Sequence, residues 1–125
     1  MPNIRVDLDH SRRTLVPALG DALHRALVDG LDMEENDLFQ TFTVHDDGEL
    51  RFSRTYGGGD RAEIIFVQVI ASLGYTPEAK QRMSQAIFEN LAELGIRRDA
   101  VLISVHEIDP ANWYLGAEPS STVGP

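Results

Sequence analysis

The sequence predicts an α/β fold in which a tandem β-α-β repeat forms a four-stranded mixed sheet with two helices on one face, together with a β-hairpin and a short C-terminal strand. Three observations support this fold class. A strand pattern changes into a helical pattern near residue 14, a glycine-rich joint occupies 56–60, and the same order of patterns then returns. Because β-α-β connections are right-handed and join parallel strands, each repeat should contribute one parallel pair.

The first β-α-β unit spans about residues 2–45. Apolar and polar residues alternate over 3–9, which is the period of a half-buried strand. From Thr14 the apolar residues recur three and four apart, which predicts a helix. Since a proline is tolerated only in the first helical turn, Pro17 makes Thr14 the expected N-cap. Residues 38–45 are rich in Phe, Thr and Val and predict the second strand.

A turn and a joint separate the two units. Asp46-Asp47-Gly48 is typical of a hairpin turn, so residues 49–54 should return as the second arm of a β-hairpin. The glycines at 57–59 lack the Lys-Ser/Thr of a phosphate-binding loop and precede a strand. They therefore indicate a linker.

The second unit spans about residues 63–107 and repeats the order of the first. Residues 63–71 form a strand that is apolar on both faces. Thr76-Pro77 opens a helix with an N-cap and a proline at the first position, and Gly95 ends it. Residues 100–107 predict the fourth strand.

The whole pattern indicates one domain over residues 1–117, with a short strand or loop at 112–117 and a flexible tail at 118–125. Two helices can cover only one face of a four-stranded sheet. The third and fourth strands nevertheless carry apolar residues on both sides, so other copies of the chain should cover the second face. The sequence therefore predicts an oligomer.

Composition excludes several classes of protein. The chain has no cysteine, which excludes disulfides, thiolate catalysis and Cys-based metal sites. Its net charge is −9 with scattered basic residues, so nucleic acid and anionic membranes are poor partners. The N-terminus is charged where a signal peptide would be apolar, and we expect a cytoplasmic protein. The histidines show no metal-ligand spacing, and no metal is expected; they are His10, His24, His45 and His106.

Pro2 is the residue most suited to chemistry. It directly follows Met1 and opens into the first strand, so its amine would be held rigidly once Met1 is removed. A secondary amine in an apolar pocket has a lowered pKa and can act as a base, whereas a nearby carboxylate restores the cationic acid. It can also attack a carbonyl carbon. If Met1 stays, Pro2 is a tertiary amide and none of these roles is possible.

Three segments together resemble the tautomerase superfamily, most closely its malonate semialdehyde decarboxylase-like branch. They are Pro2 after Met1, the Asn36-Asp37-Leu38-Phe39-Gln40 segment, and Asn112-Trp113-Tyr114-Leu115-Gly116, within a tandem β-α-β chain. The resemblance covers the chain to about residue 117.

This resemblance implies a homotrimer that needs no cofactor, with Pro2 as catalytic amine and Asp37 as the pocket aspartate that activates water. Substrate-binding residues are expected at Arg12, Phe39, Tyr75, Trp113 and Leu115.

One departure from the decarboxylases concerns the substrate carboxylate, which they hold with two arginines just after the third strand. Residues 71–75 of this chain contain no arginine. Losing a bidentate guanidinium removes the best carboxylate ligand. Arg12, Arg54 and Arg61 are the possible substitutes.

The sequence is consistent with three functions. The first is an enzyme that uses the Pro2 amine as acid and base on a small carbonyl compound or 2-keto/enol acid. The second is a decarboxylase or hydratase of a three-carbon acid or semialdehyde, with Asp37 activating water. The third is a non-catalytic oligomer of the same fold that binds a ligand or protein.

Overall fold

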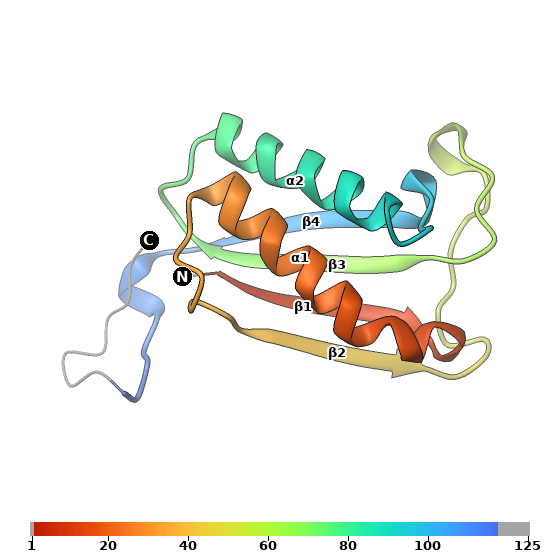
Figure 1. Cartoon of the computed structure of the whole chain (residues 1–125), viewed down its shortest axis with the longest axis horizontal. Coiled ribbons are helices and arrows are strands. Elements are labelled where there is room, and N and C mark those ends of the chain that lie inside the picture. Colours follow the sequence, from red (N-terminus) through yellow and green to blue (C-terminus); the bar gives the residue numbers. More distant parts are fainter. Residues whose placement is uncertain (1, 118–125) are drawn as a thin grey trace.

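A computed structural model describes residues 2–117 and shows a four-stranded sheet in the order β2-β1-β3-β4 with both long helices on one face (Figure 1). β1 runs parallel to β2, β3 runs parallel to β4, and the central pair β1/β3 is antiparallel. The predicted mixed sheet is confirmed, whereas the tail predicted at 118–125 lies outside the described residues. The long elements are β1 (Asn3–Asp9), α1 (Val16–Leu31), β2 (Gln40–His45), β3 (Ile65–Ser72), α2 (Pro77–Ala92) and β4 (Val101–Ile108).

The two helices begin differently. A 3₁₀ helix, His10–Leu15, precedes α1, and the Asp9 carboxylate caps it by accepting from the Ser11 N–H at 2.9 Å. The expected N-cap at Thr14 is therefore wrong, although Pro17 does lie in the first turn of α1. At α2 the prediction is confirmed, because Thr76 Oγ1 accepts from the Ala79 N–H at 3.1 Å.

The predicted β-hairpin is absent. The turn after β2 forms, with the Glu49 N–H donating to the Asp46 carbonyl at 3.2 Å, but residues 49–54 form no strand. Instead the Arg61 guanidinium donates to the carbonyls of Ser53, Tyr56 and Asp99. These bonds hold the segment against the start of β4, away from β2.

The predicted C-terminal strand is also absent from the described residues. Asp109 accepts from the Ala111 N–H at 2.9 Å and caps a 3₁₀ helix, Pro110–Asn112. Because this turn directs the chain away from the sheet edge, residues 113–117 continue without strand pairing.

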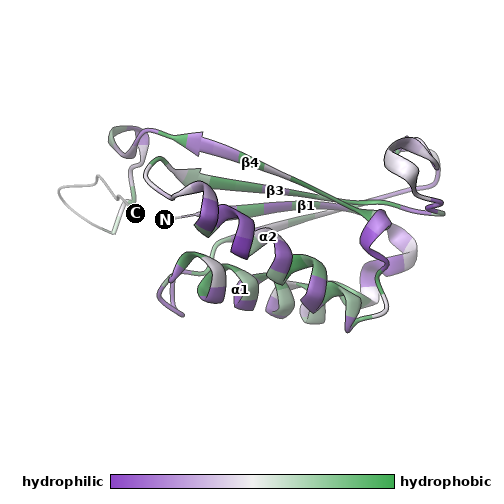
Figure 2. Cartoon of the chain, turned by 90° about the horizontal axis from the view of Figure 1, so that it is seen from above, coloured by the Kyte–Doolittle hydropathy of each residue, from purple (hydrophilic) through white to green (hydrophobic). Residues whose placement is uncertain are grey.

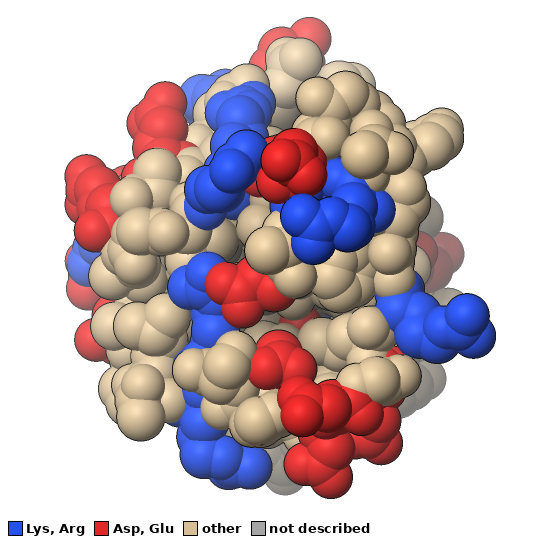
Figure 3. Space-filling view, turned by 90° about the vertical axis from the view of Figure 1, so that its right-hand side faces the viewer, with Lys and Arg blue, Asp and Glu red and all other residues tan. Residues whose placement is uncertain are grey.

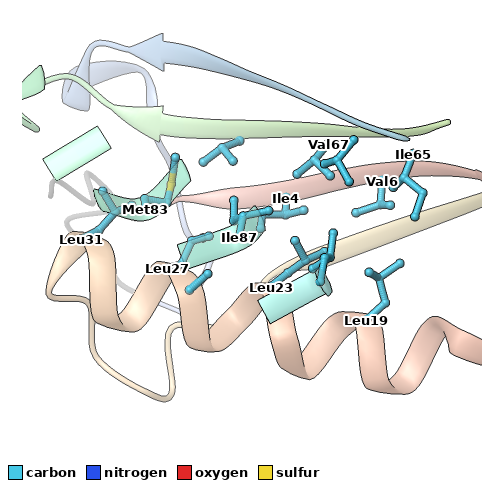
Figure 4. Packing of buried hydrophobic residues seen from close by; sticks show 14 of the residues in the cluster. Ile4, Val6, Leu19, Leu23, Leu27, Leu31, Ile65, Val67, Met83 and Ile87 are labelled. Atoms are coloured by element: carbon cyan, nitrogen blue, oxygen red, sulfur yellow. The ribbon is translucent and has the colours of Figure 1, made fainter. Parts of the chain in front are cut away.

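The hydrophobic core lies between the helices and the sheet (Figures 2 and 4). Gly30 permits the close contact of α1 with α2, since a Cβ at this position would lie 2.4 Å from the Cα of Met83. Neither long helix is long and apolar enough to span a membrane. The buried side chains shared by helices and sheet include Leu19, Leu23, Leu27, Leu31, Met83, Ile87, Ile4, Val6, Ile65 and Val67.

The face of the sheet without helices is mixed in character. Its apolar side chains are Phe66, Ile70, Leu102 and Ile108, and Leu102 is 55% exposed. Polar residues alternate with them or lie beside them on neighbouring strands, namely Arg5, Thr41, Gln68, Ser104 and His106. The third and fourth strands are thus less apolar on this face than the sequence indicated. An oligomer contact here would be limited to a smaller apolar patch.

Candidate active site

One end of the sheet brings together four segments that are distant in sequence. Since β1 is antiparallel to β3, this end holds the starts of β1 and β2 and the ends of β3 and β4 (Figure 1). We call it the Pro2 end. Six of the seven predicted site residues lie on the segments that meet here: Pro2 before β1, Asp37 and Phe39 before β2, Tyr75 after β3, and Trp113 and Leu115 after β4.

Pro2 is buried at the start of a central strand. The Ile4 N–H donates to the Phe39 carbonyl at 3.0 Å, and Ile4 lies opposite Gln40 in the parallel pair. These contacts fix the start of β1 against the segment that contains Asp37. A backbone nitrogen at this position has a defined direction, as acid–base chemistry requires.

Asp37 is partly buried in the turn before β2, where its N–H donates to the Glu34 carbonyl at 3.1 Å. Burial raises the pKa of the Asp37 carboxyl above its usual value. The positive charge of His24 opposes this pKa shift, and the Glu34 carboxylate reinforces it. A carboxyl in such a position can hold or release a proton closer to neutral pH than an exposed aspartate.

Tyr75 and Trp113 are further polar residues on the segments that meet at the Pro2 end. Burial raises the pKa of the Tyr75 hydroxyl, and the negative charge of Asp37 raises it further. The Trp113 Nε1–H is buried and has no hydrogen-bond partner among the described residues. Phe39, 41% exposed, and the half-buried Leu115 provide apolar surface.

Arg12 lies at the opposite end of the sheet, which we call the far end. It lies in the 3₁₀ helix that follows β1, about 20 Å from Pro2 at the usual rise per strand residue. Its guanidinium pairs with Glu63. Arg54 and Arg61 lie on the same side of the molecule, where Arg54 pairs with Asp60 at 3.3 Å. Basic and acidic side chains intermingle over this end (Figure 3).

The histidines take structural partners. His45 Nε2 lies 2.7 Å from Asp7 Oδ1, and His106 Nε2 lies 2.9 Å from the Ser104 hydroxyl. Within residues 2–117, one group of side chains lies close enough together to hold a metal ion. Single ligand atoms of Asp9, His10 and Asp47 lie within 4.8 Å of one another. His10 and Asp47 are exposed, and His10 is hydrogen-bonded to Asp47, so the group is an ordinary surface ion pair.

Two residues at the Pro2 end were missed by sequence reasoning. Ser72 is fully buried at the end of β3, and its hydroxyl has no partner among the described residues. Arg5 is exposed in a concavity of about 430 Å³ that Phe39 and Ile70 also line, and no ion pair of its side chain occurs in the described region. Arg5 lies opposite Gln68 in the β1/β3 pair and Ser72 lies opposite Ile108 in the β3/β4 pair, and no local sequence pattern gives these partners.

Comparisons with known proteins identify the family and the fold. Probable tautomerase YrdN of Bacillus subtilis (strain 168) is 28% identical over 118 residues, which are 93% of this chain and 92% of that protein. The crystal structure of FG41 malonate semialdehyde decarboxylase inhibited by 3-bromopropiolate is 36% identical, with a TM-score of 0.84 over 90% of this chain and 88% of that one.

A second malonate semialdehyde decarboxylase, solved to explain its decarboxylase and hydratase activities, is 26% identical with a TM-score of 0.82 over 90% and 89% of the two chains. A symmetric trimer of fused 4-OT shares the fold at 18% identity, with a TM-score of 0.73 over 91% of each chain. The family model for tautomerase enzymes matches residues 37–116, more than half of the sequence. The chain therefore belongs to the tautomerase family and is an enzyme of the tautomerase superfamily, on its malonate semialdehyde decarboxylase-like branch.

Proposed function

We propose that this enzyme transfers protons on a small carbonyl compound or 2-keto/enol acid, with the free Pro2 amine as acid and base after removal of Met1. The observation that carries this proposal is the burial of Pro2 at the start of a central strand, beside an Asp37 carboxyl whose pKa burial raises. Burial of the amine favours its neutral form and an ionised carboxylate favours its cationic form, so both forms are accessible near neutral pH.

The chemistry requires no cofactor. The neutral amine takes the hydroxyl proton of an enol, and the resulting ammonium delivers a proton to the adjacent carbon as the C=O bond forms. Substrate and product are isomers, so the reaction consumes no other reactant. Phe39 and Leu115 supply apolar walls, and the unpartnered Trp113 Nε1–H supplies a donor for a substrate oxygen.

The direct test follows the keto–enol conversion of an arylpyruvate with the wild type and with Pro2→Ala. General acid–base groups contribute about 10²- to 10⁴-fold to rate, so a loss of that order is expected. The mass of the purified wild-type chain must also show that Met1 is gone. Equal rates for the two proteins, or retention of Met1, would remove Pro2 from the mechanism.

Decarboxylation or hydration of a three-carbon acid or semialdehyde is the second candidate, favoured by the 36% identity to a decarboxylase over 90% of this chain. In decarboxylation the C–C bond to the carboxylate breaks and CO₂ leaves. The electron pair of this bond forms an enolate that cationic Pro2 stabilises, and a proton then adds to the enolate carbon. In hydration Asp37 takes a proton from the water whose oxygen bonds to one carbon of the substrate double bond, the π electron pair shifts to the neighbouring atom, and cationic Pro2 protonates that atom. Release of CO₂ from malonate semialdehyde without arylpyruvate ketonisation would favour this candidate over the first.

The Arg12 assignment requires a second copy, because its guanidinium lies at the far end of its own chain. We propose a homotrimer in which the far end of one chain meets the Pro2 end of the next. The buried Arg12 Nε has no partner among the described residues, like Ser72 Oγ and Trp113 Nε1 at the other end. Such a contact would bring the Arg12 guanidinium of one chain and the Trp113 Nε1–H of the next to one substrate carboxylate.

A non-catalytic oligomer of the same fold that binds a ligand or protein is the third candidate. The arginine-free stretch at 71–75 favours it, because the family's carboxylate ligands are missing there. Failure of both candidate reactions in a chain with a free Pro2 amine, together with retained binding of a small carboxylate, would support this function.

A further inference from the structure

Ser72, the last residue of β3, carries a hydroxyl inside the protein. Ser72 is 0% exposed, and its Oγ has no hydrogen-bond partner among the described residues. A buried hydroxyl without a partner is destabilising and uncommon in native proteins. It therefore calls for a partner that the unprocessed chain does not supply.

The strand register identifies this partner. Ile4 lies opposite Val69 and Asn3 lies opposite Ile70 in the antiparallel β1/β3 pair. One further step brings Pro2 opposite Ala71, and Ser72 is the next residue of β3. The Pro2 nitrogen lies on the side of Pro2 away from Asn3, which is the side of Ser72. Residues opposite each other in such a pair have Cα atoms only about 4.5–5.5 Å apart.

Removal of Met1 changes what the Pro2 nitrogen can do. Within a chain, a proline nitrogen carries no hydrogen and cannot donate to Ser72. Once Met1 is removed it becomes a secondary amine, with one N–H when neutral and two when cationic. The hydrogen-bond donor that Ser72 lacks in the full chain is thus created by the step that creates the proposed catalytic group.

We propose that Ser72 is a positioning residue for the Pro2 amine, its Oγ accepting a hydrogen bond from the Pro2 N–H in the processed enzyme. This inference rests on the proposed function, since it needs a free Pro2 amine. The bond fixes the direction of the nitrogen. Hydrogen bonds from charged donors are stronger than those from neutral donors, so Ser72 also favours the cationic amine.

Other charged and titratable groups surround this end of the sheet, including His106 opposite Ile70, and a Ser72 variant retains all of them. Asp37 precedes β2, Tyr75 follows β3, and His24 of α1 acts on Asp37. Glu107 of β4 is paired with Lys80 of α2 at 2.8 Å, while Arg5 is exposed on β1 and Asp109 is exposed just after β4. A titration change in a Ser72 variant can therefore be assigned to the hydroxyl.

The composition of the chain makes the test clean. Lys80 is the only lysine, so the processed protein has just two aliphatic amines, the Pro2 amine and the Lys80 amine. Phenyl isothiocyanate reacts with neutral amines. The rate of labelling at each site, followed against pH and resolved by peptide mapping, gives the midpoint for Pro2 with Lys80 as internal reference.

Four proteins are compared: wild type, Ser72→Ala, Ser72→Thr and Ser11→Ala. Ser72→Ala removes one oxygen and should lower the Pro2 midpoint by about 0.5 to 1 pH unit, the equivalent of one hydrogen bond. Ser72→Thr keeps the hydroxyl and should stay near the wild-type value. Ser11→Ala, at an exposed serine of the far end, is the matched control and should leave the midpoint unchanged. Circular dichroism verifies that each variant is folded.

The outcomes separate the two proposals. If the wild-type N-terminal peptide retains Met1, or if Pro2 is labelled but Pro2→Ala keeps full activity, the proposed function fails and this inference has no catalytic role. If Pro2 is free and needed for activity but the Ser72→Ala midpoint is unchanged, the positioning role alone is wrong. A raised midpoint would show that Ser72 donates to the neutral amine, which also overturns the role assigned here.

Discussion

The Pro2 end and the far end of the same sheet differ in how their polar groups are partnered. At the far end, arginines are paired with carboxylates or with backbone carbonyls: Arg12 with Glu63, Arg54 with Asp60, and Arg61 with three carbonyl oxygens. At the Pro2 end, a buried hydroxyl and a buried indole N–H have no partner, and burial raises the pKa of Asp37.

This difference separates structural from functional polar groups. Paired groups stabilise the chain as it stands, whereas unpartnered groups in a folded protein are expected where a ligand completes them. One atom at the far end breaks the pattern, because the buried Arg12 Nε also lacks a partner. This atom is the reason for proposing that the far end serves the site of a neighbouring copy.

Asp37→Asn should produce the largest effect of the changes considered below. The amide keeps the shape of the side chain but removes both the negative charge and the proton-accepting oxygen. We expect kcat to fall by about 10²-fold or more, with substrate binding much less affected. Glu34→Gln is the matched control, because it removes an adjacent exposed carboxylate; if it lowered kcat as much as Asp37→Asn, local charge rather than Asp37 itself would be responsible.

Arg12→Gln tests whether the two ends cooperate between copies. Loss of one hydrogen-bonded charge should raise KM for a carboxylate substrate by about tenfold with little change in kcat, and should cost about 1–2 kcal/mol of stability through Glu63. Steady-state kinetics and denaturant unfolding measure the two effects separately.

Co-expression of Pro2→Ala chains with Arg12→Gln chains distinguishes shared from separate sites. If each site takes Pro2 from one chain and Arg12 from the next, random assembly restores about one quarter of the sites. If both residues serve the same chain, no mixed site is complete and activity stays at the level of the two variants, which would contradict the arrangement proposed here.

Trp113→Phe has a smaller expected effect. The substitution keeps an aromatic wall and removes the indole N–H, so only one neutral hydrogen bond to substrate is lost. We expect KM to rise about fivefold with kcat nearly unchanged, the equivalent of about 1 kcal/mol. Tyr114→Phe, at an exposed neighbouring ring, should leave KM as it is. Unchanged KM in Trp113→Phe would show that the Nε1–H does not contact substrate.

The β-α-β order in the sequence was enough to predict the sheet and one end of it. Alternation in 3–9 and helical spacing after it identify β1 and α1, and parallel pairing then places Asp37 near Pro2. The hairpin was predicted wrongly because the Arg61 side chain competes for the backbone of 53–56, a contact that no local pattern encodes. Ser72 was missed because its burial depends on how the strands pair around the end of β3, where it lies opposite Ile108 of β4.

The Asp37 pKa shift makes the smallest and most specific prediction, a change in how stability depends on pH. Its pKa in the folded state is raised above the unfolded value of about 3.8, mainly by burial. For a raised carboxyl, the stabilising contribution is present below the unfolded pKa and is lost as pH rises through the folded pKa. Ionised Asp37 therefore destabilises the fold at neutral pH, whereas an asparagine carries no such penalty.

Denaturant unfolding of wild type and Asp37→Asn between pH 3.5 and 7 measures this difference. The stability of Asp37→Asn relative to wild type should increase with pH over this range, so the variant with the lower kcat becomes the more stable protein. Asp21→Asn, at an exposed position on α1, provides the matched comparison. A relative stability that stays constant with pH would show that Asp37 carries no burial penalty. The Pro2 end would then have lost one of the features that distinguish it from the far end.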